Sequence, residues 1–185
     1  MGEGLAEGGN WRFDVAVDGF EEDKARFPSR PSDAHIADID DAVSREAARL
    51  IESDGPDLSW VYLQYTDDVA HEHGDSLELD QAVVDMDARL SLIWSAVQAR
   101  QEALNEDWLI IVTTDHGRDA LTGRSHGAQS KRERTIWIVT NSQRLTPDFY
   151  SMPAIVDIYP SIATHLGITI PGQVARHLDG ASFIQ

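Results

Sequence analysis

Side chains that bind metals are concentrated in the stretch from Tyr65 to Asp75, which reads YTDDVAHEHGD. Asp67 and His71 stand four residues apart in it. A carboxylate oxygen and an imidazole nitrogen both bind a divalent cation at about 2 Å, so this pair could hold one ion. We expect Asp68 and His73 to lie outside that ligand set.

A second group of possible ligands follows the apolar run WLIIVTT. Asp115 and His116 come directly after it, and His126 lies in the glycine-flanked sequence GRSHGAQ. Five ligands are too few for two complete tetrahedral sites and too many for one, which suggests a two-metal centre with part of its shell missing. The structural alternative is that these residues cap helices or form turns.

Apolar residues at helical spacing predict three helices. They cover residues 34–53, a stripe from Leu79 to Val97, and a short face from Ile158 to Leu166 that Gly167 ends. Ser32 or Asp33 is placed to cap the first helix, and Asp75 with Glu78 resembles a capping box for the second.

Short apolar runs predict the strands. SWVYLQY (59–65), WLIIVTT (108–114) and TIWIVTN (135–141) read as buried strands, and WRFDVAVDGF (11–20) as a strand or hairpin arm. Their order with the helices predicts an α/β fold, a three-layer sandwich with a mostly parallel sheet between helices. YTDDVAHEHG, as a loop, and TTDHGR would then both lie beyond the carboxyl ends of strands.

Composition limits the possible partners. The chain has 185 residues, no cysteine and a formal net charge of -17, so thiolate metal sites are excluded and nucleic acid or an anionic membrane is not an expected partner. No apolar run approaches the roughly 20 residues of a membrane span, and the first residues lack a signal-peptide pattern. We expect a flexible lead-in over 1–10 and a single α/β domain over 11–185.

Together these motifs resemble the alkaline phosphatase superfamily, nearest its nucleotide pyrophosphatase and phosphodiesterase branch. Asp67, His71 and Gly74 match one motif of that branch, Asp115-His116-Gly117 a second, and His126-Gly127 a third. The tail VDIYPSIATHLG resembles the last helix of the family. The resemblance covers roughly residues 57–185.

The resemblance implies hydrolysis of a small phosphate mono- or diester with two divalent metal ions, usually zinc, with manganese or iron as alternatives. Asp67, His71 and His126 would hold one ion, and Asp115 and His116 the other. The residues Gln129, Arg132 and Arg134 themselves suggest a contact with an anionic substrate, and they could equally form a solvated loop. Members of the family are often secreted or periplasmic.

The family also uses an upstream Asp ligand and a nucleophilic Thr or Ser, well before the first motif, and here 66 residues precede Asp67. We therefore expect a carboxyl-terminal part of a longer catalytic domain, with its amino-terminal half missing and weak or no activity alone. In an alternative reading, Asp18 is the upstream ligand and Ser32 the nucleophile.

Two other functions stay open. The chain could be a non-catalytic remnant that keeps the fold as a metal-binding or structural module. It could also resemble sulfatases or cofactor-independent phosphoglycerate mutases, which share the fold and the Asp-His-Gly motif. Sulfatases need a Cys or Ser that is converted to formylglycine, and the chain has no Cys and no suitable Ser motif.

Overall fold

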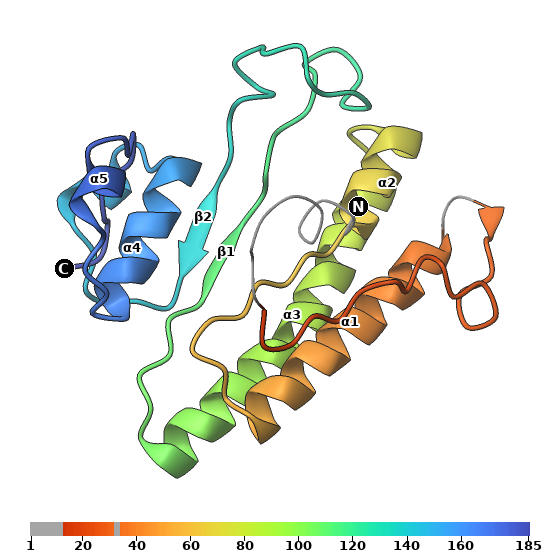
Figure 1. Cartoon of the computed structure of the whole chain (residues 1–185). Coiled ribbons are helices and arrows are strands. Elements are labelled where there is room, and N and C mark those ends of the chain that lie inside the picture. The colour runs from red at the N-terminus through yellow and green to blue at the C-terminus, as the bar shows by residue number, and fades with distance from the viewer. Residues whose placement is uncertain (1–12, 32–33) are drawn as a thin grey trace. The chain divides into compact units, whose positions relative to one another are not determined.

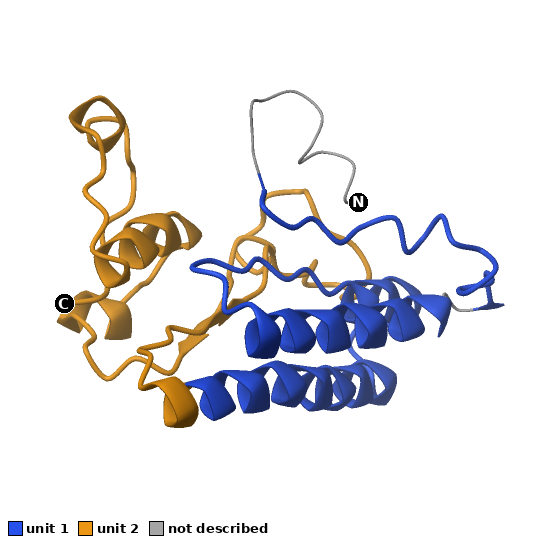
Figure 2. Ribbon diagram, turned by 60° about the horizontal axis from the view of Figure 1, so that its bottom comes forward, with its two compact units in different colours: residues 1–100 blue, residues 101–185 orange. Residues whose placement is uncertain are grey.

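A computed structural model describes residues 13–31 and 34–185 and divides the chain into two compact units, residues 1–100 and 101–185 (Figure 2). The expected lead-in over 1–10 and the cap residues Ser32 and Asp33 lie outside the described residues. A single domain over 11–185 stays a prediction. None of the described helices combines the length and apolar character that crossing a membrane would require.

The first unit is helical, and the second mixes short strands and helices (Figure 1). Unit 1 contains α1 (Ala34–Ser53), α2 (Tyr65–His73) and most of α3 (Leu77–Leu104). Unit 2 contains the strands β1 (Ile111–Thr113) and β2 (Ile138–Thr140). It also contains the short 3-10 helices η2 (Pro147–Tyr150) and η3 (Ile155–Asp157) and the α-helices α4 (Ile158–His165) and α5 (Gly172–Ala175).

The long helices of unit 1 agree with the sequence. Helix 34–53 is confirmed by α1, and the stripe from Leu79 to Val97 lies within α3. The two helices run side by side in Figures 1 and 2. Arg89 joins them, because its Nε donates to Asp41 Oδ1 at 2.6 Å and its Nη2 to the Ala37 carbonyl at 3.2 Å.

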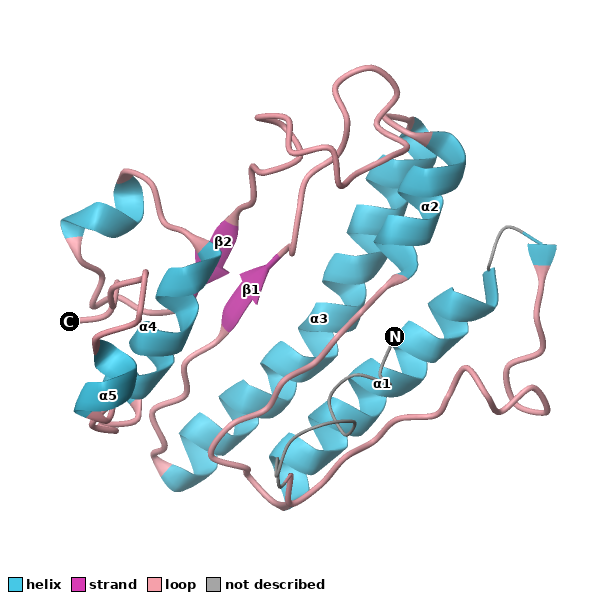
Figure 3. Cartoon of the chain, turned by 45° about the horizontal axis from the view of Figure 1, so that its top comes forward, coloured by secondary structure: helices cyan, strands magenta, loops and turns pink. Residues whose placement is uncertain are grey.

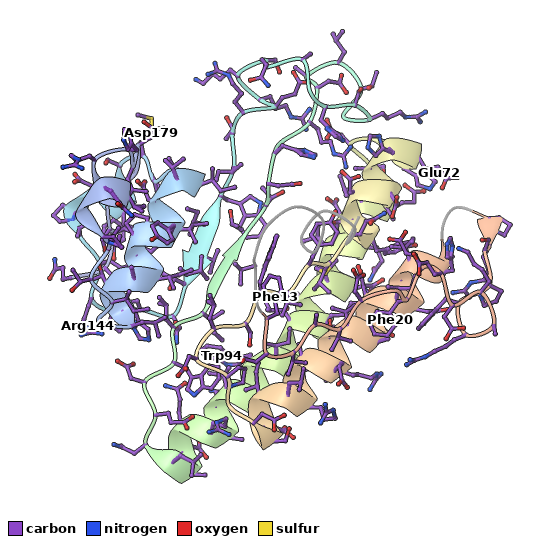
Figure 4. All side chains as sticks on the ribbon, viewed as in Figure 1. Phe13, Phe20, Glu72, Trp94, Arg144 and Asp179 are labelled. Atoms are coloured by element: carbon purple, nitrogen blue, oxygen red, sulfur yellow. The ribbon has the colours of Figure 1, made fainter. Side chains whose placement is uncertain are left out.

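A small aromatic and aliphatic core covers the start of α1. Phe27, Ile36 and Ile39 are buried, and Phe20 and Tyr65 pack against them. The rings of Phe20 and Phe27 meet edge to face with their centroids 5.8 Å apart. Figure 4 shows Phe20 beside α1. The segment after residue 13, expected as a strand or hairpin arm, holds no strand and turns at Gly19.

The segment SWVYLQY was predicted wrongly as a buried strand. Residues 59–64 have no regular structure, and Trp60 is 68% exposed. Among the described residues, extended segments pair only in β1–β2 and in the Leu145–Ile184 bridge, so SWVYLQY has no strand beside it. An apolar run forms a strand only where a neighbouring strand takes its backbone hydrogen bonds.

A buried carboxylate on α1 anchors the beginning of α2. Asp40 accepts hydrogen bonds from the backbone N–H groups of Gln64 at 3.0 Å and Tyr65 at 2.8 Å. These two groups lie at the amino end of α2 and have no partner inside the helix. Burial raises the pKa of Asp40 to about 6, although the two N–H groups and Arg89 act to lower it.

The sheet of unit 2 has two short antiparallel strands (Figure 3). Ile111 pairs with Thr140 and Thr113 with Ile138. The α/β class is therefore confirmed, whereas the described residues show no three-layer sandwich and no parallel pair. The segment 114–137 holds turns but no helix, whereas the crossover between parallel strands is usually helical.

The Asn141 side chain continues the pairing beyond the strands, because its Oδ1 accepts from Ile110 N at 2.8 Å and its Nδ2 donates to the Trp108 carbonyl at 2.7 Å. The predicted strands 108–114 and 135–141 are confirmed over three residues each. Their predicted burial is wrong, because β1 is only partly buried and Val139 in β2 is 58% exposed.

The end of the chain is fixed by two residues of the motif VDIYPSIATHLG. Asp157 accepts from the backbone N–H groups of Ala154 and Ala181, each at 2.8 Å. Ser161 Oγ accepts from Phe183 N at 2.9 Å, and Phe183 is buried. The predicted helix is confirmed as α4, and Gly167 with φ 66° follows its end.

The raised pKa of Asp40 predicts a pH dependence of stability. The folded chain keeps a proton that an unfolded Asp has lost, so this contribution is complete below about pH 4 and disappears as pH rises through 6. Compared with a D40N variant, the wild type should lose about 1 kcal/mol of unfolding free energy between pH 5 and 7.5. Urea unfolding followed by circular dichroism measures the unfolding free energy of both proteins at each pH. A difference in unfolding free energy that stays constant with pH would contradict the raised pKa of Asp40.

Candidate metal site

The first acid–imidazole pair lies on one face of α2. Asp67 and His71 are one helical turn apart, and His71 Nε2 lies 3.3 Å from Asp67 Oδ2. The prediction of a loop here is wrong, because Asp40 anchors the start of the helix and residues i and i+4 then face the same side. Both side chains are partly exposed, at 34% and 45%, so a cation could reach them.

The end of α2 is defined by glycine and serine. Gly74 has φ 67° and donates its N–H to the Ala70 carbonyl at 2.8 Å, a conformation that favours glycine. Ser76 Oγ accepts a hydrogen bond from Leu79 N at 3.2 Å, so Ser76 is the N-cap residue of α3. The predicted capping box of Asp75 and Glu78 is therefore wrong by one residue. Figure 4 shows Glu72 at this end of α2, pointing outward.

The second pair lies in unit 2 just after β1. His116 Nε2 is 3.6 Å from Asp115 Oδ1, and His116 Nδ1 is 2.9 Å from the Gly117 carbonyl oxygen. A carbonyl oxygen only accepts, so Nδ1 donates this hydrogen bond and orients the ring. A histidine that ligates a metal is oriented in the same way, by a hydrogen bond on its other nitrogen.

His126 stacks on His116. Their ring centroids are 3.8 Å apart with an interplanar angle of 21°. Gly127 follows with φ 100°, and a Cβ there would meet nothing within 4 Å. Glycine is therefore required at this position by backbone conformation and not by crowding.

Glu133 holds the loop that carries His126, a role that the sequence analysis missed. Its carboxylate accepts from Ala128 N at 2.8 Å and Ser130 N at 2.9 Å, while Ser130 Oγ accepts from Glu133 N at 3.3 Å. Hydrogen bonds from the Ser130 hydroxyl and from these two backbone groups lower the pKa of Glu133. The reciprocal Ser130–Glu133 contact is a capping box, so the pattern S-x-x-E was a usable signal.

The same segment also packs against the Asp-His-Gly turn. Gly117 N donates to the Glu133 carbonyl at 2.8 Å. A Cβ at Gly117 would lie 2.1 Å from the Arg132 carbonyl oxygen. Asp119 closes the next turn by accepting from the backbone N–H groups of Thr122 and Ser125, and these bonds lower its pKa.

The five predicted ligands thus fall into two sets. Asp67 and His71 belong to unit 1, while Asp115, His116 and His126 belong to unit 2. Each set contains an acid and an imidazole close together, which is a donor set that suits zinc or manganese. Of the alternative site residues, Asp18 is exposed and accepts from Gly19 N at 2.7 Å, and Ser32 lies outside the described residues.

The comparison with protein families decides the affiliation. The sequence model of the family "type I phosphodiesterase / nucleotide pyrophosphatase" matches residues 8–168. The chain belongs to this family. The match includes all five predicted ligands and begins well before residue 57, where the motif resemblance starts.

Searches among curated proteins and solved structures gave no match. The family membership of this type I phosphodiesterase / nucleotide pyrophosphatase relative therefore stands on the family match and on the motifs themselves.

The close approach at Gly117 gives a test of how the Asp-His-Gly turn is built. Substitution Gly117→Ala should lower the unfolding free energy by about 1–3 kcal/mol, because a methyl group must displace the Arg132 carbonyl. Gly172→Ala is the control, since a Cβ there meets nothing within 4 Å. Equal melting temperatures of the two variants would show that the turn tolerates a side chain at Gly117.

Proposed function

We propose that this chain carries the metal-binding part of a metal-dependent hydrolase of phosphate mono- or diesters. The observation that carries the proposal is the pair of acid–imidazole contacts, Asp67–His71 and Asp115–His116, in a chain of this family.

The assignment of ligands follows the family motifs. Asp67, His71 and His126 hold one divalent cation, and Asp115 and His116 hold the other. Zinc is our first choice and manganese the second, because carboxylate and imidazole ligands suit both. The hydrogen bond from His116 Nδ1 to the Gly117 carbonyl keeps Nε2 available as the ligand atom.

When bound, the two cations stabilise negative charge on the nonbridging phosphoryl oxygens and lower the pKa of a bound water. The protein's own part is to hold the ligand atoms in place. The helical spacing of Asp67 and His71 does this in unit 1, and the Glu133 capping box does it for the His126 loop in unit 2.

The family uses a nucleophilic Thr or Ser that lies upstream of its first motif. No Thr matches the family position, so we propose that a further segment of the catalytic domain supplies it and completes the α/β sandwich. The alternative assigns the nucleophile to Ser32 and an additional ligand to Asp18.

Zinc titration tests the ligand assignment. Substitution of Asp67 or His126 by Ala should weaken zinc binding about tenfold or more, since loss of a residue that merely supports a ligand already costs about 10–100-fold. Isothermal titration calorimetry on the full chain measures this, with His177→Ala as the control because His177 is exposed. The same affinity in all variants would remove these residues from the site.

Hydrolysis of bis(p-nitrophenyl) phosphate tests the origin of the nucleophile. We expect little turnover by the isolated chain with zinc, because the nucleophile is held elsewhere. Turnover that a chelator abolishes and that Ser32→Ala removes would overturn this part of the proposal and assign the nucleophile to Ser32. It would also exclude a non-catalytic remnant.

A further inference from the structure

Unit 2 contains a small pocket beside the stacked histidines. Its volume is about 200 Å³, and its lining joins His116 and His126 to Gln129, Glu133 and Arg134. Pockets for drug-sized ligands have roughly 300–1,000 Å³. This pocket is therefore suited to a group of the size of a phosphate rather than to a nucleoside.

The segment around this pocket is basic in a strongly acidic chain. Residues 115–134 contain five Lys and Arg and three Asp and Glu, whereas the whole chain has a net charge of -17. Two of those acids, Asp119 and Glu133, accept several hydrogen bonds from neighbouring backbone N–H groups. Their charge is thereby partly offset inside the loop, and the local surplus of positive charge favours an anion.

Arg134 is held at the pocket by the backbone. Its Nε donates to the Gln129 carbonyl oxygen at 3.1 Å. Gln129 has φ 67°, a left-handed conformation that is uncommon for residues other than glycine. The Glu133 carboxylate holds it in place, because it accepts hydrogen bonds from the N–H groups of the two neighbours, Ala128 and Ser130. Nη1 and Nη2 supply the other four N–H donors of the guanidinium group, in a fork that matches phosphate oxygens.

We propose that Arg134 is a specificity-determining residue that binds a second anionic group of the substrate, next to the phosphoryl group that is hydrolysed. It thereby favours substrates that carry a further negative charge over diesters with a single charge. The role rests on the proposed function, because it assumes that the phosphoryl group lies at the histidines. The anion contact itself requires no metal.

Binding to metal-free protein tests the contact separately from hydrolysis. The full chain is treated with a chelating resin and titrated by calorimetry with inorganic pyrophosphate and with dimethyl phosphate, which carries one charge. Arg134→Ala should weaken pyrophosphate binding about tenfold, the order expected for one charge-assisted hydrogen bond. It should leave dimethyl phosphate nearly unchanged.

Two variants complete the design. Arg124→Ala removes the same charge from the same segment, and Arg124 does not line the pocket, so its pyrophosphate affinity should stay within about twofold of wild type. Arg134→Lys keeps the charge but loses the fork, and it should bind at an intermediate level.

Equal losses of pyrophosphate affinity in Arg134→Ala and Arg124→Ala would show that only net charge matters and would overturn the proposal. The proposal would also be overturned if the wild type bound pyrophosphate no more tightly than dimethyl phosphate. Failure of the zinc titration alone would remove the metal ligands and leave the Arg134 contact standing, so the two proposals fail separately.

Discussion

The first acid–imidazole pair, Asp67 and His71, depends on one buried contact, in which the Asp40 carboxylate holds the amino end of α2. The carboxylate accepts hydrogen bonds from the backbone N–H groups of Gln64 and Tyr65, which have no acceptor within the helix. Burial still dominates, because the pKa of Asp40 rises to about 6, a shift that corresponds to about 3 kcal/mol against the charged form. The long helix α1 thereby fixes the start of α2, which has nine residues and would be only marginally stable by itself.

Glu133 performs the same task in unit 2 with the opposite electrostatic balance. It accepts from two backbone N–H groups and from the Ser130 hydroxyl, and its pKa is lowered. Hydrogen bonds therefore outweigh desolvation at Glu133, whereas desolvation outweighs them at Asp40. In both units a carboxylate outside the proposed ligand set organises the backbone beside residues of that set.

The sequence predicted the features that depend on local periodicity. Helix α1 and the helical stripe within α3 follow from apolar residues three and four apart, and Gly167 ends α4 as expected. The Asp–His pairs could also be found, because each lies within five residues of sequence.

What the sequence could not show were contacts between distant residues. Asp40 and Tyr65 are 25 residues apart, and without their contact YTDDVAHEHGD reads as a loop instead of α2. The run SWVYLQY has strand composition, but composition does not supply the neighbouring strand that it requires. The antiparallel direction of β2 depends on how the loop 114–137 returns the chain to β1, which local periodicity does not show.

The division of the ligands between two units bears on how the site can work. A single acid–imidazole pair supplies two of the four positions of a tetrahedral zinc site. Each unit alone should therefore bind a cation weakly, even though its own pair is formed by local structure. Where ligands from separate parts of a chain share an ion, the free energy of binding also stabilises the folded arrangement. On the proposed ligand assignment, tight metal binding would then be linked to folding of the segments that carry the ligands.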